Sequence, residues 1–287
     1  MKERKKVLLW LLIVAVLLAA SILTGNHAGQ SETIQQTMRD AVLHNENRIN
    51  LLGWKAVNPG LISGFVVTAI LLIAAAVLRI FWIPRFKYVP GRCQLVLEEV
   101  VGLFDRMAKT SSPRMNRFLG AYIFGAGVYI FVGTLFELFG FQAITTAGRA
   151  ITLPAPLSDV NGAIALGCLS YVVILSGGIA GNGIKGVKAT LKEFSLPISM
   201  SFRLFGALLS GLLVTELVYY YINLSYILPV VVGVLFTLLH AVIQSYVLTM
   251  LTAMFYGEVS QPEPEVEKEP KHARARHRSH ENTPQAA

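Results

Sequence analysis

Charge is scarce in this chain. Asp, Glu, Lys and Arg together make up 15% of the 287 residues, and hydrophobic residues make up 54%. An ordinary soluble domain has about a quarter of its residues charged. The shortage of charge excludes an ordinary soluble globular domain, and it predicts a protein that crosses a membrane several times.

Cysteine pairs and catalytic motifs are also lacking. Cys93 and Cys168 are far apart in the chain and form no C-x-x-C pair, so they support neither a disulfide framework nor a metal site. The glycine-rich stretch 181–188 lacks the spacing of a nucleotide-binding loop, and neither H-E-x-x-H nor G-x-S-x-G occurs. We therefore expect a chain that is not an enzyme by itself and that holds no metal or cofactor.

Five apolar stretches are each long enough to cross a membrane. They lie at residues 61–82, 118–141, 162–180, 194–222 and 227–256. The last two exceed the roughly 20 residues that a perpendicular helix needs, so we expect them to be tilted or to run partly along a neighbouring surface. Residues 94–109 instead show the pattern of an amphipathic helix lying at the membrane interface. The sequence therefore predicts an all-α polytopic membrane protein.

The two ends of the chain differ from this membrane domain, which we place at residues 61–258. Within residues 1–60, the apolar run 7–24 follows a basic start and fits either a membrane anchor or a signal peptide, and the rest is polar. Residues 259–287 are rich in Pro and Glu and then in basic residues, which is typical of a disordered tail. Its three histidines could bind a metal, although a solvated tail is the simpler interpretation.

Lysine and arginine are unevenly divided between the connections. Nine of them fall on one side of the predicted spans: Arg85, Lys87, Arg92, Lys109, Arg114, Arg117, Lys185, Lys188 and Lys192. The other side has Arg149 and no Lys or Arg from 216 to 227. Because cytoplasmic loops carry the excess of positive charge, we place the first set and the C-terminus in the cytoplasm of a bacterial-type cell. These loops and the tail account for the net charge of +8, so no nucleic-acid partner is needed.

One charge interrupts a long apolar stretch. Arg203 is the only formal charge between Glu193 and Glu216. A guanidinium near the bilayer centre costs about 3 kcal/mol on insertion scales, and it cannot escape by deprotonating. At 100° per residue its helix face is almost bare of bulky side chains, and five small residues cluster around it: Ser199, Gly206, Ala207, Ser210 and Gly211. Small residues often serve helix packing within a chain, but a buried cation beside them favours a partner that brings an anion.

Five further polar residues each allow a structural and a functional interpretation. Glu216 lies about 140° around the helix from Arg203, and is either solvated at the outer boundary or a protonatable step in a hydrated path. His240 and Gln244 are one turn apart in the last span and serve either packing or ion transfer. Glu137 and Asp159 lie near the outer ends of their segments, and Asp159 also fits a helix N-cap.

Several of these residues occur in motifs that resemble one family, subunit a of the rotary F-type ATP synthases. Residues 201–206, Ser-Phe-Arg-Leu-Phe-Gly, are similar to its Ser-Leu-Arg-Leu-Phe-Gly core, and Gln244 follows about forty residues later. Residues 156–161 contain Asp159 and Asn161 and resemble the family's Pro-x-x-Asp-x-Asn segment. Residues 89–94 resemble its Val-Pro-Gly-x-x-Gln. The resemblance covers roughly residues 61–258.

The resemblance implies a stator that moves ions, H⁺ in our expectation, onto and off a rotating ring of c subunits. Arg203 would attract each arriving ring carboxylate in its deprotonated form, and Gln244 would position the guanidinium. Two offset half-channels would make the ion ride the ring and so couple ion flow to rotation and ATP synthesis. The ring would pass the small-residue face. Subunit b of the peripheral stalk and membrane lipid are the other implied partners.

This chain departs from the family pattern at four positions. Ala207 stands where the family often has Asn, and Leu212 stands where it has an acid, so Glu216 is the candidate substitute. Thr237 occupies the usual ionisable position before the glutamine, and His240 lies one turn nearer to Gln244. Glu137 stands where Asn is commoner, and is a candidate carboxylate for the outer channel.

Two other classes of function remain open to the sequence. A free-standing ion or solute transporter would be favoured by an inverted repeat, which we do not find. A structural anchor for a peripheral stalk would not need Arg203. Substitution of Arg203 separates both of these from the stator channel.

Overall fold

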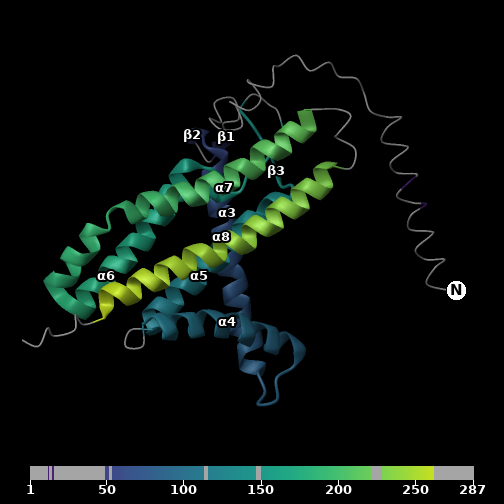
Figure 1. Cartoon of the computed structure of the whole chain (residues 1–287). Helices are drawn as coiled ribbons and strands as arrows, with labels where there is room; N and C mark the ends of the chain where they lie inside the picture. Colours follow the sequence, from purple (N-terminus) through teal and green to yellow (C-terminus); the bar gives the residue numbers. More distant parts are fainter. Residues whose placement is uncertain are drawn as a thin grey trace, which may run out of the picture.

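The computed structural model describes residues 49–51, 54–112, 116–146, 150–220 and 228–261, together with positions 12 and 15. The apolar run 7–24 and the histidine-containing tail lie outside these residues, apart from positions 12 and 15. Figure 1 shows the fold as a set of long helices with two small hairpins at one end.

Six long helices account for most of the described chain: α3 (Pro59–Val77), α4 (Arg92–Ser111), α5 (Asn116–Leu135), α6 (Val160–Lys192), α7 (Ser195–Tyr220) and α8 (Leu228–Ser260). Five of these, all except α4, are long and apolar enough to cross a membrane. The prediction of an all-α polytopic protein with five spans is confirmed. α3 continues through a π-turn (Leu78–Trp82) and a 3₁₀ turn (Ile83–Arg85).

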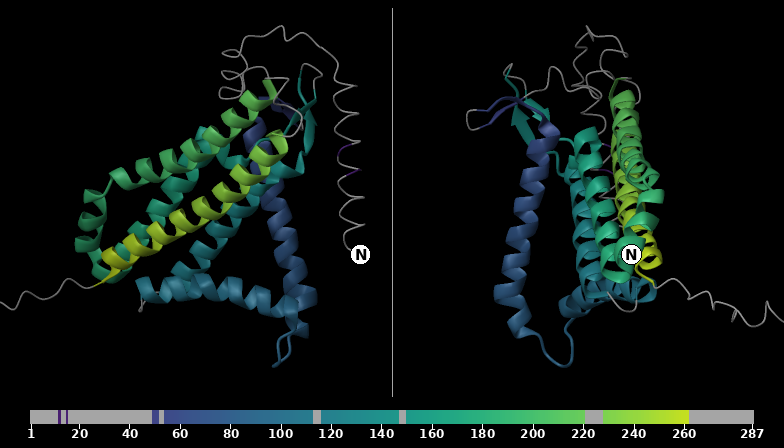
Figure 2. Two further views of the ribbon diagram at one scale, coloured as in Figure 1. Left: turned by 45° about the vertical axis from the view of Figure 1, so that its right-hand side comes forward. Right: turned by 90° about the vertical axis from the view of Figure 1, so that its left-hand side faces the viewer.

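Helices α5 to α8 pack together, and α3 stands to one side of them (Figure 2). α7 and α8 run side by side and obliquely to α3, as Figures 1 and 2 both show. The core between these helices is built from aliphatic side chains that include Leu119, Ile123, Ile130, Ile174, Met200, Leu204, Leu208 and Leu248. Much of the outer apolar surface of α3, α7 and α8 stays exposed, as expected for helices that face lipid or partner subunits.

α4 lies across one end of the bundle rather than along it (Figure 2). Its buried Phe104 packs edge-to-face on Phe124 of α5, with 5.7 Å between ring centroids. Ion pairs such as Lys109 to Asp105 line its exposed side. The predicted amphipathic pattern of this segment is therefore confirmed.

The side chain of Gln94 closes the loop that precedes α4. Its Oε1 accepts a hydrogen bond from the N–H of Lys87 (3.1 Å), and its Nε2 donates to the carbonyl of the same residue (3.0 Å). The side-chain amide thus makes the pair of hydrogen bonds to Lys87 that a residue on a neighbouring antiparallel strand would make. This gives a physical reason for the glutamine in the Val-Pro-Gly-x-x-Gln motif.

Two short hairpins were not predicted from the sequence. β1 (Ile49–Leu51) pairs with β2 (Trp54–Val57), and β3 (Gln142–Ile144) pairs with β4 (Ala150–Thr152), both antiparallel. They lie at the end of the fold where α3 and α6 begin and α5 ends (Figure 1). Two or three pairs of residues are too few to give a readable alternation of polar and apolar residues.

α6 is a helical hairpin: the predicted span 162–180 lies in its first arm, and the connection that follows this span is helical as well. Gly183 has φ +56° and ψ −132°, a backbone conformation that residues with a side chain rarely adopt. Beyond Gly183 the chain folds back on itself. This return brings Thr190 beside Tyr171, whose hydroxyl donates a hydrogen bond to the carbonyl of Thr190 (3.0 Å). In an unbroken helix these residues would lie about 28 Å apart.

Candidate functional site

Arg203 lies in the N-terminal half of α7 and is exposed. Within the part of the chain that the structure describes, its guanidinium makes no hydrogen bond or ion pair. An arginine that is always charged and has five donors does not stay unpaired in an apolar environment without cost. The described chain therefore presents an unpaired cation on the surface of a membrane helix.

The small-residue face predicted around Arg203 is largely open. Ser199, Gly206 and Ser210 are exposed, whereas Ala207 and Gly211 are half-buried. A side chain added at Gly206 would meet nothing within 4 Å, and one added at Gly211 would lie 3.5 Å from Nδ1 of His240. The face thus runs from open surface beside Arg203 to a contact with α8.

A different pair of small residues lets α7 approach α6. Gly167 is buried, and a Cβ there would lie 3.0 Å from the carbonyl of Pro197 and closer still to the hydroxyl of Ser201. Ser201 is itself buried and donates to that same carbonyl at 2.6 Å. Helix packing within the chain is therefore served by Gly167 and Ser201, which leaves the Arg203 face available for something outside the described chain.

Gln244 is buried in α8 at 6% exposure, and its Oε1 has no hydrogen-bond partner among the described residues. The next residue, Ser245, is fully satisfied because its hydroxyl donates to the carbonyl of Gly127 at 2.8 Å. The structure brings Arg203 and Gln244 to two neighbouring helices but shows no hydrogen bond between them. An orphaned buried amide oxygen calls for a functional or packing explanation.

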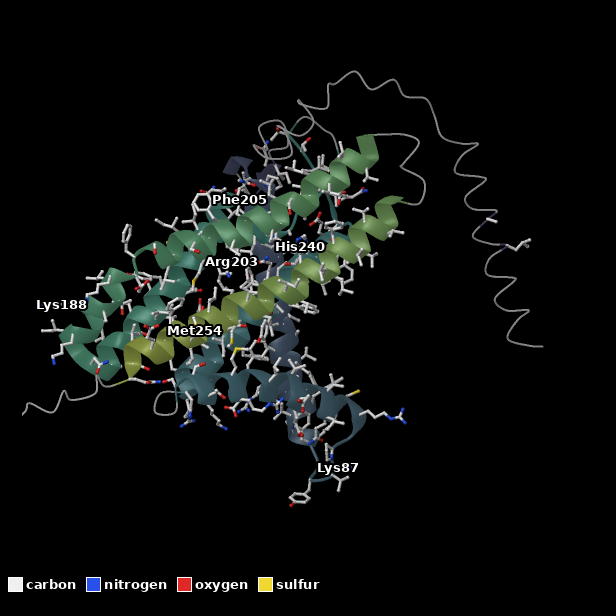
Figure 3. All side chains as sticks on the ribbon, viewed as in Figure 1. Lys87, Lys188, Arg203, Phe205, His240 and Met254 are labelled. Atoms are coloured by element: carbon white, nitrogen blue, oxygen red, sulfur yellow. The ribbon has the colours of Figure 1, made fainter. Side chains whose placement is uncertain are left out.

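His240 lies one turn from Gln244, half-buried against α7 (Figure 3). Its ring contacts Phe236, with centroids 5.9 Å apart, and it fills the space over Gly211. His240 thus sits at the α7–α8 boundary, next to the small-residue face and on the same pair of helices as Arg203.

Asp159 occupies the N-cap position of α6, but its side chain makes no capping hydrogen bond. Its Oδ1 instead accepts from Nδ2 of Asn58 at 3.1 Å, across 101 residues of chain. Asn58 is the N-cap of α3 and was missed by the sequence analysis. An Asn followed by Pro at the start of an apolar run is the signal that marks it.

The other predicted polar residues lie toward the same end of the fold. Asn161 is exposed in the first turn of α6. Glu137 is half-buried in a 3₁₀ turn, Phe136–Phe139, that follows α5. Position 216 lies on the part of α7 that runs toward this end, but the side chain of Glu216 is outside the described residues.

A hollow of about 260 Å³ opens at the opposite end, between the α6 hairpin and the end of α8. Its charged lining residues are Lys185, Lys192, Glu193 and Glu258. The two ends of the helices thus both carry polar groups, with Arg203 and Gln244 between them in the chain's apolar part.

Comparison with known proteins gives one consistent result. A family model described as ATP synthase A chain matches residues 63–257. Two curated proteins, both described as ATP synthase subunit a and both from Cereibacter sphaeroides, strains ATCC 17025 and ATCC 17029, are each 27% identical over 199 residues. Those alignments cover 65% of this chain and 76% of each relative. The matched region includes every candidate site residue and all of the five spans except the first four residues of the first and the last three of the fifth.

Proposed function

Because this chain belongs to the ATP synthase A chain family, and is thus a multi-pass subunit of the membrane sector of an ATP synthase, we propose that it is the stator that passes ions to a rotating c-ring. The chain itself catalyses no covalent chemistry. It supplies two offset half-channels, so that an ion crosses the membrane only by riding the ring. Ion flow is thereby coupled to rotation and to ATP synthesis elsewhere in the complex.

The observation that carries this proposal is the unpaired, exposed Arg203 beside small residues. A ring carboxylate arriving at this face meets a fixed positive charge, which favours its ionised form. The carboxylate therefore releases its ion before it passes. Gly206 and Ser210 leave room for a helix backbone to approach closely, and the exposed face of α7 lets the ring helix move past.

The polar groups at the two ends supply the half-channels in this proposal. We assign Asp159, Asn161, Glu137 and Glu216 to the outer path, and His240 and Gln244 to the step between this path and Arg203. The hollow beside Glu193 and Glu258 gives water access from the inner side. That end carries lysines, which include Lys87 and Lys188 (Figure 3), and by the positive-inside rule we assign it to the cytoplasm.

The exposed surface of α3 is the remaining large contact area. Leu72 and Ile73 are 66% and 64% exposed there, and α3 stands apart from the other spans (Figure 2). We assign this surface to lipid and to the membrane anchor of subunit b. The ring and the stalk then contact opposite parts of the chain.

Substitution of Arg203 tests the proposal. In membrane vesicles that contain the whole complex, Arg203→Ala should abolish ATP-driven ion pumping while the complex still assembles. Arg203→Lys should also pump poorly, because an ammonium lacks the fixed fork of donors. Lys188→Ala is the matched control, since that lysine is exposed at the cytoplasmic end. Normal pumping by an assembled Arg203→Ala complex would refute the stator channel.

A further inference from the structure

Asn58 joins the starts of two spans. Its Oδ1 accepts a hydrogen bond from the N–H of Gly60 at 2.9 Å, which caps α3. Its Nδ2 donates to Oδ1 of Asp159 at 3.1 Å. Because a backbone N–H fixes which end of the amide is the oxygen, the other end must present donors to Asp159. A carboxylate is the partner that this arrangement fits.

The two helix starts are in direct contact at this point. A Cβ built on Gly60 would lie only 2.8 Å from Cβ of Asp159, a distance that real side chains essentially never show. The N-terminus of a helix carries a partial positive charge. Asp159 therefore lies where the positive ends of α3 and α6 meet.

Asp159 uses only part of its hydrogen-bonding capacity there. It occupies the cap position of α6 without capping it. Among the described residues, the amide of Asn58 is its one side-chain partner. Asp159 is half-buried, and its second carboxylate oxygen has no side-chain partner among the described residues.

We propose that Asn58 is a positioning residue for ion uptake, whose amide holds Asp159 off the α6 cap so that the second carboxylate oxygen receives water and the incoming ion. This inference rests on the proposed function, because it places Asp159 in the outer half-channel. It deepens that function by giving a role to a residue on α3, a helix that is otherwise distant from Arg203.

Asn58→Ser removes the amide donor but keeps a good N-cap for α3. Loss of a hydrogen bond to a charged group corresponds to about a tenfold effect. We expect ATP synthesis per assembled complex, driven by an ion gradient in vesicles, to fall by about that factor. Rates are taken per assembled complex, because a purely structural role would change the amount of complex and leave the rate of each one unchanged.

Ser63→Ala is the matched control. Ser63 is buried in the second turn of α3 and donates to the carbonyl of Pro59 at 3.0 Å. Its removal loosens the same helix start without touching Asp159. Its rate per complex should equal that of the wild type.

A second substitution of Asn58 gives a further test. Asn58→Asp places two carboxylates side by side and should be as slow as Asn58→Ser or slower. Asp is also a good N-cap, so α3 keeps its cap in this variant.

A wild-type rate per complex in Asn58→Ser would overturn the inference, as would a wild-type rate in Asn58→Asp. If Asn58→Ser does not assemble, Asn58→Asp decides the matter by itself. Either negative result, together with loss of pumping in Arg203→Ala, would leave the proposed function standing. Pumping by Arg203→Ala would instead remove the proposed function as well.

Discussion

Arg203 and Gln244 each have a polar group that lacks a hydrogen-bond partner among the described residues, but their surroundings differ. Arg203 is exposed and unpaired on α7, whereas Gln244 is buried on α8 with an unpartnered oxygen. A buried amide that made only packing contacts would be replaceable by an apolar side chain of similar size at little cost. The two residues therefore make a prediction that separates packing from function.

Gln244→Leu should leave the stability of the assembled complex unchanged or raise it, because it removes a buried unsatisfied oxygen. In our account the same change lowers ATP-driven pumping by about tenfold, the effect of one lost hydrogen bond to a charged group. Pumping and thermal stability are measured on the same vesicles.

Ser245→Ala gives the opposite combination and serves as the control. It removes the hydrogen bond to the carbonyl of Gly127, so stability should fall by about 1 kcal/mol while the pumping rate is retained. A Gln244→Leu complex that pumps at the wild-type rate would show that Gln244 is a packing residue.

At the residue scale, the sequence identified Arg203 but did not reveal the contact that Asp159 makes at the outer end of the fold. Arg203 stands out because it is a single cation in an apolar run, and position alone makes it visible. Asp159 was recognised as a cap candidate, yet its actual partner lies 101 residues away. No local pattern reports a contact over that separation, so Asn58 emerged only from the structure.

At the scale of elements, hydropathy found every span, but it did not find the break in α6. The run Gly-Gly-Ile-Ala-Gly-Asn-Gly at 177–183 looks like a loop by composition. It is instead a packed hairpin tip, in which Asn182 donates to the carbonyls of Val259 (2.9 Å) and Gln261 (2.6 Å). The glycines serve close approach: the Tyr256 ring lies over Gly177, and Gly186 meets the backbone of Gly178.

Gly183→Ala should destabilise this hairpin. A side chain at φ +56° costs about 1–2 kcal/mol, which corresponds to a fall of about 2–8 °C in the midpoint of thermal unfolding for a chain of this size. Thermal unfolding of the detergent-solubilised complex measures it.

Gly125→Ala is the control for that change. Gly125 is exposed in α5, and an added Cβ would meet nothing within 4 Å. Alanine favours a helix over glycine by about 1 kcal/mol, so this variant should unfold at the same temperature or higher. Equal midpoints for the two variants would show that the backbone at Gly183 is not constrained as described.

At the scale of the whole molecule, the exposed surfaces divide into distinct areas. The open face of α7 carries Arg203. The exposed apolar side chains of α3 belong to a helix that stands to one side of the others (Figure 2). The apolar composition predicted the class of protein, and the lengths of the apolar stretches predicted the number of spans. Which surface meets a partner depends on the packing of α6, α7 and α8, and that information is spread over the whole chain.

The central claim is that the ring moves past the Arg203 face, and cross-linking tests it most directly. Ser199→Cys and Ser210→Cys, each made in a chain whose two native cysteines are replaced by serine, are oxidised against a cysteine placed beside the ring carboxylate. Leu72→Cys on α3 is the exposed control. The account predicts cross-links from both α7 positions, with loss of ATP-driven rotation, and none from α3. Cross-links from α3 and none from α7 would contradict it.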